Sequence, residues 1–188
     1  MIACVKAAAL LFGPLIILTI EASNVKLVDH GYEGLVVAIH PSVPENEQLV
    51  VKIKEVITAA SARLYSSTKR RAFFRNVTIL LPASWSPHEE YGRPSTEAFD
   101  SADVVVAQPH DSSNDEPYTV QFGLCGEKGQ HIHLAPSYLL QDTAISSYGP
   151  REKSFLHEWG HLRWGLFDEY GSPQPFYVSA AGNIENTR

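Results

Sequence analysis

The sequence predicts an α/β domain in which one long helix and one shorter helix pack on a twisted mixed sheet. Short runs rich in β-branched residues, bounded by glycine and proline, recur along the chain and are typical of buried strands. Residues 45–66 carry apolar side chains at spacings of three and four, which is typical of an amphipathic helix. A second helical segment follows Gly149-Pro150. The 188 residues are enough for one domain with a core of its own.

The predicted strands share flanking turn residues and a high content of valine, isoleucine and aromatic side chains. They cover residues 25–29, 35–39, 73–81, 103–107, 118–122, 130–134 and, near the end of the chain, 176–178. The LVVAI run at 35–39 is apolar and rich in β-branched residues, so we expect it to be a buried strand. The strand at 130–134 precedes the second helix along the chain.

The long helix over residues 45–66 serves as scaffold. Its charged residues lie opposite the apolar ones, and Glu45 and Glu47 stand in the first turn, where the helix dipole favours negative charge. The apolar positions that we expect to face the core are Leu49, Val50, Ile53, Val56, Ile57, Ala60 and Leu64.

Composition excludes several classes of protein. A hydrophobic content of 44% with 19% charged residues is typical of a globular chain rather than a disordered one. The formal charge is −6 and no basic cluster exceeds Lys69-Arg70-Arg71, so we expect no nucleic-acid binding. Beyond the N-terminal segment no long apolar run occurs, so the mature chain is not expected to be a pore itself.

Residues 1–22 are typical of a signal peptide. Lys6 precedes an uncharged apolar run over residues 7–20, and Ala22 is a small residue at a plausible cleavage position. The run is short for a transmembrane helix, although retention as a membrane anchor is the alternative. We therefore expect a secreted, extracellular protein that begins near Ser23.

Two features agree with the secretory route. Asn76-Val77-Thr78 is an N-glycosylation sequon, so Asn76 is the expected glycan site. Cys4 leaves with the signal peptide, and Cys125 is then the single cysteine of the mature chain. Cys125 is either a buried free thiol or a residue whose partner lies in a longer relative.

Residues 151–170, REKSFLHEWGHLRWGLFDEY, contain the motif H-E-x-x-H. On a helix His157 and His161 lie one turn apart on the same face, so both imidazoles can reach one zinc ion. Glu158 can act as general base on water activated at such a site. The alternative is an ordinary buried helix in which both histidines are satisfied polar residues, because the motif alone has false positives.

A third ligand is expected shortly after the helix. Gly165 suits a left-handed helix end, and the turn there brings Asp168 back towards the histidines. Asp168 is the first choice for this ligand and Glu169 the second.

Other polar clusters are weaker candidates for metal binding. His88, Glu89 and Glu90 fall in a proline-rich loop and are expected to be solvated. Residues 110–116 suggest a calcium-binding loop but do not match an EF-hand, so a solvated loop is favoured. His131 and His133 share one side of a strand, and we expect them on the polar face of an edge strand rather than on zinc.

The run FLHEWGHLRWGLFDEY, with NVTILLP, ADVVVAQPH and QFGLCGEKGQHIHL, resembles the calcium-activated chloride channel regulator family. The resemblance implies a secreted protein with an N-terminal zinc metalloprotease domain and a metzincin-like zincin fold. It implies zinc ligands at His157, His161 and Asp168, with Glu158 as catalytic glutamate. Family members modulate calcium-activated chloride conductance without forming the pore, so a membrane chloride channel is an expected partner.

The resemblance also implies that residues 23–188 form an incomplete metalloprotease-like domain without the cysteine-rich and von Willebrand A regions. Met1 is the only methionine, so no methionine-containing turn is expected beneath the metal.

Two functions therefore stay open. One is a zinc endopeptidase acting on a peptide or protein substrate, with Tyr170 either stabilising the oxyanion or simply packed. The other is a catalytically weak or inactive secreted protein that modulates chloride conductance by binding a partner.

Overall fold

The computed structural model describes residues 25–109 and 115–168, with 176–178, 180, 182 and 184–186. Its centre is a five-stranded mixed sheet in the order β5-β3-β6-β8-β7. The strands are β3 (Leu35–Ile39), β5 (Val77–Leu80), β6 (Val104–Val106), β7 (Tyr118–Val120) and β8 (His131–Leu134). Neighbouring strands run parallel except β7, which is antiparallel to β8 and forms one edge.

Two small sheets accompany the main one. Strands β1 (Lys26–Val28), β2 (Gly31–Glu33) and β4 (Phe73–Phe74) form a three-stranded sheet in which β2 pairs with both neighbours. Strands β9 (Phe176–Val178) and β10 (Ile184–Asn186) form an antiparallel pair. The architecture is thus mixed α/β, as the sequence predicts.

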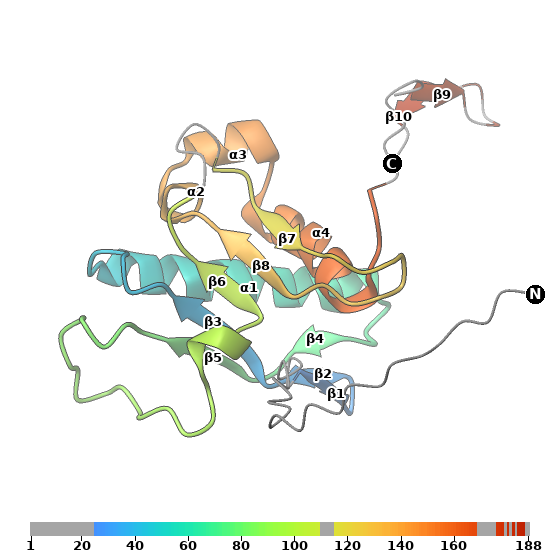
Figure 1. Ribbon diagram of the computed structural model, residues 1–188. Helices are drawn as coiled ribbons and strands as arrows, with labels where there is room; N and C mark the ends of the chain where they lie inside the picture. The colour runs from blue at the N-terminus through green and yellow to red at the C-terminus, as the bar shows by residue number, and fades with distance from the viewer. Residues whose placement is uncertain are drawn as a thin grey trace, which may run out of the picture.

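Helix α1 (Glu47–Ser67) runs behind the main sheet, with α4 (Arg151–Trp164) beside it (Figure 1). The side chain of Asn46 caps α1 by accepting a hydrogen bond from the Gln48 amide at 3.0 Å. The buried residues of α1 are Leu49, Val50, Ile53, Val56, Ile57, Ala60 and Leu64, which confirms the predicted set.

Short helices connect the sheet to α4. Helix α2 (Pro136–Leu140) follows β8, and α3 (Thr143–Tyr148) leads to Gly149, where φ is 79°. A 3-10 turn, η1 (Phe99–Ser101), precedes β6. The core between α4 and the three-stranded sheet is aromatic: Trp159 and Phe155 are fully buried and both meet Phe74 edge to face.

The expectation of one strand over residues 73–81 is wrong. β4 pairs with β2, whereas β5 pairs with β3, so the two halves belong to different sheets. Between β4 and β5 the backbone amides of Arg75 and Asn76 both donate hydrogen bonds to the Tyr32 carbonyl oxygen, at 2.9 and 3.3 Å. The regular pairing of strands is interrupted at this point. Strand propensity is continuous through the segment, but the partner strand changes.

The expectation that 130–134 is an edge strand is also wrong. β7 pairs outside β8, so β8 lies within the sheet and β7 takes the edge beside α4. The Tyr118 ring stacks on His133 at 4.7 Å, and His133 is only 7% exposed. Burial lowers the pKa of both His131 and His133, which favours neutral imidazoles in the sheet.

Candidate metal centre

The N-terminus of α4 is anchored by a buried arginine. Arg151 donates hydrogen bonds to the carbonyl oxygens of Tyr138 at 2.9 Å and Gln141 at 2.6 Å. Phe155 and Trp159 fix the buried face of the helix. These contacts determine which residues α4 turns towards solvent.

His157 and His161 lie on the side of α4 that faces away from this core. Their Nε2 atoms are 3.1 Å apart, and their rings meet edge to face at 4.6 Å between centroids. The His157 side chain is 44% exposed and that of His161 is 14% exposed. Two imidazole nitrogens that both present lone pairs at this separation repel each other unless a proton or a cation lies against them.

Gly165 ends α4 in the left-handed conformation, with φ 62° and ψ 32°, as predicted. After this turn the Asp168 carboxylate returns to the two histidines. Its Oδ1 atom lies 3.0 Å from His157 Nε2 and 3.3 Å from His161 Nε2. The structure therefore brings all three predicted ligand side chains together.

The spacing of these atoms fits a tetrahedral metal site. The three ligand atoms form a triangle with edges of 3.0, 3.1 and 3.3 Å. Zinc bonds of 2.0–2.1 Å at tetrahedral angles place neighbouring ligand atoms about 3.3 Å apart. Among the described residues, His157, Glu158 and His161 form a cluster whose potential ligand atoms all lie within 4.8 Å of one another. Asp168 contacts both histidines of this cluster.

The orientation of His161 is fixed by the same turn that positions Asp168. His161 Nδ1–H donates to the Leu166 carbonyl oxygen, which leaves the Nε2 lone pair free to face the other ligands. The Leu166 amide lies 3.5 Å from the Gly160 carbonyl oxygen. The turn at 165–166 thus orients one histidine and delivers the carboxylate.

Glu158 lies beside this triangle in a more protected position. Its side chain is 9% exposed, and its Oε1 atom is 3.9 Å from His157 Nε2. Burial raises the pKa of the Glu158 carboxyl, while a hydrogen bond from Thr119 and the neighbouring histidines act in the opposite direction. A carboxylate with a raised pKa is suited to accept and release a proton.

Thr119 is a residue of this candidate site that the sequence analysis does not identify. It lies on β7, and its Oγ1 is 2.8 Å from Glu158 Oε2 and 3.0 Å from the Glu158 carbonyl oxygen. The alternation of side chains along a strand places Thr119 on one face of the sheet. Nothing in the neighbouring sequence indicates that α4 packs against that face.

The loop between β7 and β8, residues 121–130, supports the end of α4. The Gly126 amide donates to the Gly165 carbonyl oxygen and the Gly129 amide to that of Leu162, both at 2.9 Å. A Cβ on Gly165 would collide with the backbone of Glu127. Glycine is therefore needed at position 165 for close approach as well as for its backbone angles.

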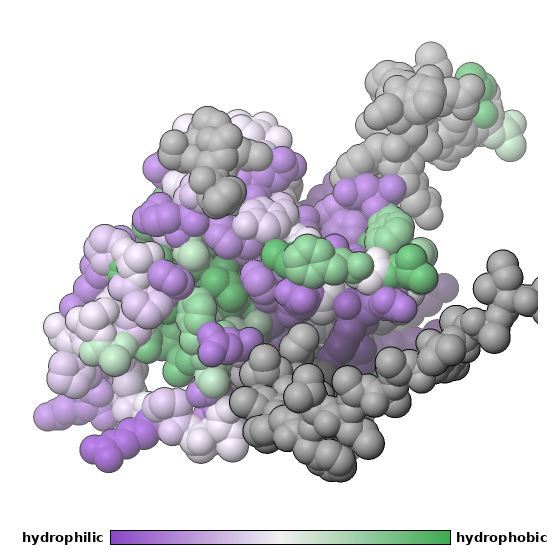
Figure 2. All heavy atoms as spheres, in the orientation of Figure 1, coloured by the Kyte–Doolittle hydropathy of each residue, from purple (hydrophilic) through white to green (hydrophobic). Residues whose placement is uncertain are grey.

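This loop also exposes apolar side chains beside the candidate site. Phe122 is 82% exposed and Leu124 75%, while Leu166 and Phe167 after α4 are each 52% exposed. Figure 2 shows hydrophobic side chains over this end of the molecule. Cys125 stands in the same loop and is exposed, so of the two alternatives for this residue the buried free thiol is wrong.

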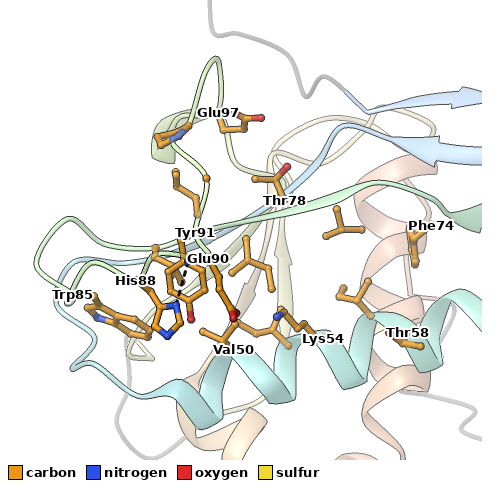
Figure 3. Close-up of a pocket in the computed structure, with 18 of the residues that line it drawn as sticks. Val50, Lys54, Thr58, Phe74, Thr78, Trp85, His88, Glu90, Tyr91 and Glu97 are labelled. Atoms are coloured by element: carbon orange, nitrogen blue, oxygen red, sulfur yellow. Dashed lines mark hydrogen bonds between the residues drawn. The ribbon is translucent and has the colours of Figure 1, made fainter.

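The other histidine–glutamate cluster lies at the opposite edge of the main sheet. His88 and Glu90 border a groove of about 1520 Å³ between α1, β5 and the loop over residues 82–97. Trp85, His88 and Tyr91 reach over α1 near Val50 in this groove (Figure 3). The His88 and Tyr91 rings contact each other in a tilted arrangement, with 4.9 Å between ring centroids, and their loop is exposed as expected.

Several predicted features lie outside the described residues: the signal peptide over 1–22, residues 110–114 of the acidic loop at 110–116, Glu169 and Tyr170. Asn76 is described and exposed, immediately before β5.

A comparison with protein families matches residues 25–188 to the model described as calcium-activated chloride channel N terminal. The chain belongs to this family. It is 52% identical over 168 residues to calcium-activated chloride channel regulator 1 of Bos taurus, a match that covers 89% of this chain and 18% of the relative. It is 48% identical over 183 residues to regulator 2 of Mus musculus, covering 97% of this chain and 19% of that relative. The chain therefore spans about a fifth of the length of these relatives.

No solved structure matches the fold. In the part of the chain that the structure describes, no helix combines the length and apolar character needed to cross a bilayer.

Proposed function

We propose that this domain is a secreted zinc-dependent endopeptidase with a metzincin-like fold. The observation that carries the proposal is the triangle of His157 Nε2, His161 Nε2 and Asp168 Oδ1, with edges of 3.0–3.3 Å, beside the protected carboxylate of Glu158. Two imidazoles and one carboxylate, with a fourth position open, are the donor set of a catalytic zinc site.

His157, His161 and Asp168 would hold the metal. A zinc ion held there supplies a Lewis acid that polarises a peptide carbonyl and lowers the pKa of water. The chain itself supplies the proton transfer: Glu158 accepts a proton at Oε1 from the attacking water and gives it to the leaving nitrogen. The raised pKa of the Glu158 carboxyl favours its uptake of the proton from the attacking water.

The relatives are named as regulators of calcium-activated chloride channels. We propose that any effect of this chain on chloride conductance acts through a channel or an associated protein as its partner. If the protein binds zinc but does not hydrolyse peptides, binding to such a partner is the remaining way in which it would affect chloride conductance.

The experiment separates these outcomes by comparing the wild type with Glu158→Gln, both loaded with one equivalent of zinc, on a mixed peptide library. We expect cleavage by the wild type and a loss on the order of a hundredfold or more in Glu158→Gln. Glu55→Gln, an exposed glutamate on α1, is the matched control and should cleave like the wild type. Equal product formation by the wild type and Glu158→Gln would contradict the enzyme proposal.

A further inference from the structure

We infer that Thr119 is a positioning residue that holds the carboxylate of Glu158, an inference that rests on the proposed function for its catalytic meaning. Thr119 Oγ1 lies 2.8 Å from Glu158 Oε2, and the two residues are 39 positions apart in the sequence. The contact joins the edge strand β7 to the metal-binding helix α4.

The hydrogen bond distinguishes the two carboxylate oxygens. Oε2, at 2.8 Å, is a nearer acceptor for the single Thr119 hydroxyl proton than the Glu158 carbonyl oxygen at 3.0 Å, whereas Oε1 is the oxygen 3.9 Å from His157 Nε2. A carboxylate attached at one oxygen has lost rotation about its terminal bond, which is otherwise a broad torsion. Oε1 is therefore directed towards the ligand triangle and is the oxygen available to take a proton.

The threonine is itself held in place. Thr119 pairs with Ile132 across β7 and β8, and its β-branched side chain has a restricted first torsion. Its methyl group fits against Gly129, because a Cβ there would lie 2.7 Å from Thr119 Cγ2. With the methyl group on that side, the hydroxyl faces Glu158.

Because the Glu158 side chain is buried, loss of its hydrogen bond with Thr119 should have a large effect. The Glu158 side chain is 9% exposed, so solvent gives little alternative hydrogen bonding to an oxygen that loses its donor. Loss of the Thr119 hydroxyl should let the carboxylate turn and should misplace Oε1. A misplaced general base lowers turnover rather than substrate affinity.

The first measurement examines the contact in the metal-free protein, without turnover. Infrared spectra of protein labelled with ¹³C at the glutamate carboxyls are compared for wild type, Thr119→Val and Thr119→Ser, and the Glu158 band is identified by its loss in Glu158→Gln. Valine keeps the shape of threonine without the hydroxyl, and serine keeps the hydroxyl. We expect the band to shift in Thr119→Val and to stay near the wild-type position in Thr119→Ser.

The second measurement is hydrolysis of the same peptide substrate by the zinc-loaded proteins. We expect kcat to fall on the order of tenfold or more in Thr119→Val with KM nearly unchanged, and to recover in Thr119→Ser. Thr58→Val, an exposed threonine of α1, is the control and should leave both constants unchanged.

The outcomes separate the two proposals. An unshifted Glu158 band in Thr119→Val overturns the inference whatever the kinetics, and so does a shifted band with wild-type kcat. If the wild type cleaves no faster than Glu158→Gln, the proposed function fails, and the band alone decides whether Thr119 orients Glu158.

Discussion

The two edges of the main sheet carry different kinds of candidate site. At the β5 edge, α1 and the loop over residues 82–97 enclose the groove of about 1520 Å³, with a largely apolar lining. At the β7 edge, polar atoms of α4 and the following turn converge to within 3.0–3.3 Å. The groove contains polar groups that do not converge on one point. In the candidate metal centre, by contrast, the side chains of His157, Glu158, His161 and Asp168 lie together. The convergence of ligand atoms, rather than the volume of a hollow, therefore locates the candidate chemistry.

The largest expected effect is a difference in zinc binding between variants at the two edges of the main sheet. His161→Ala removes one of the three proposed protein ligands and should abolish stoichiometric zinc binding, whereas His88→Ala at the groove should bind zinc like the wild type. Metal content after gel filtration and a competitive zinc titration measure both. Retained stoichiometric binding in His161→Ala would contradict the ligand assignment.

The next effect concerns stability. Phe155 is fully buried against Phe74, and Phe155→Ala should lower the free energy of unfolding by about 3–5 kcal/mol. Phe122, which is 82% exposed beside the site, should change it by less than about 0.5 kcal/mol when replaced by alanine. Urea denaturation with a common slope checks both values. Similar losses in the two variants would show that the apolar loop is as essential to the core as α4.

A smaller effect concerns the turn that delivers Asp168. Gly165→Ala introduces a side chain at φ 62° and against the Glu127 backbone, so it should cost about 2 kcal/mol or more and weaken zinc binding. Gly92 lies in the loop over the groove, where an added Cβ would meet open space, so Gly92→Ala should be neutral or stabilise by about 0.4–1 kcal/mol. Thermal unfolding and zinc titration measure both variants. Equal zinc affinity in Gly165→Ala and wild type would contradict the role of this turn.

The smallest effect on the fold is expected at Asn76, which is exposed at the start of β5. Expression through a eukaryotic secretory pathway should add a glycan there, and a glycosidase should increase the electrophoretic mobility of the wild type. Asn76→Gln should have the deglycosylated mobility and near wild-type stability. Unchanged mobility of the treated wild type would show that the sequon is unoccupied.

Local patterns account for the parts of the fold that are predictable from sequence. The buried face of α1 and the left-handed end of α4 at Gly165 depend on spacing within one helix, and both are confirmed. The convergence of His157, His161 and Asp168 is predictable too, because all three lie within twelve residues joined by one turn.

The missed features depend on pairing between distant segments. Sequence alone does not show that β7 lies outside β8, because the order of strands is set by packing. For the same reason the sequence does not predict the break between Phe74 and Val77 or the contact of Thr119 with Glu158.

The most direct test of the metal centre is an anomalous difference map from crystals of zinc-loaded protein, measured at the zinc absorption edge. We predict one strong peak about 2.0–2.1 Å from the Nε2 atoms of His157 and His161 and about 2.0–2.2 Å from an Asp168 oxygen. Glu158 should lie outside the ligand set, with Oε1 towards the site and Oε2 on Thr119. A peak at His88 and Glu90 in the groove, or a peak that excludes Asp168, would contradict this assignment.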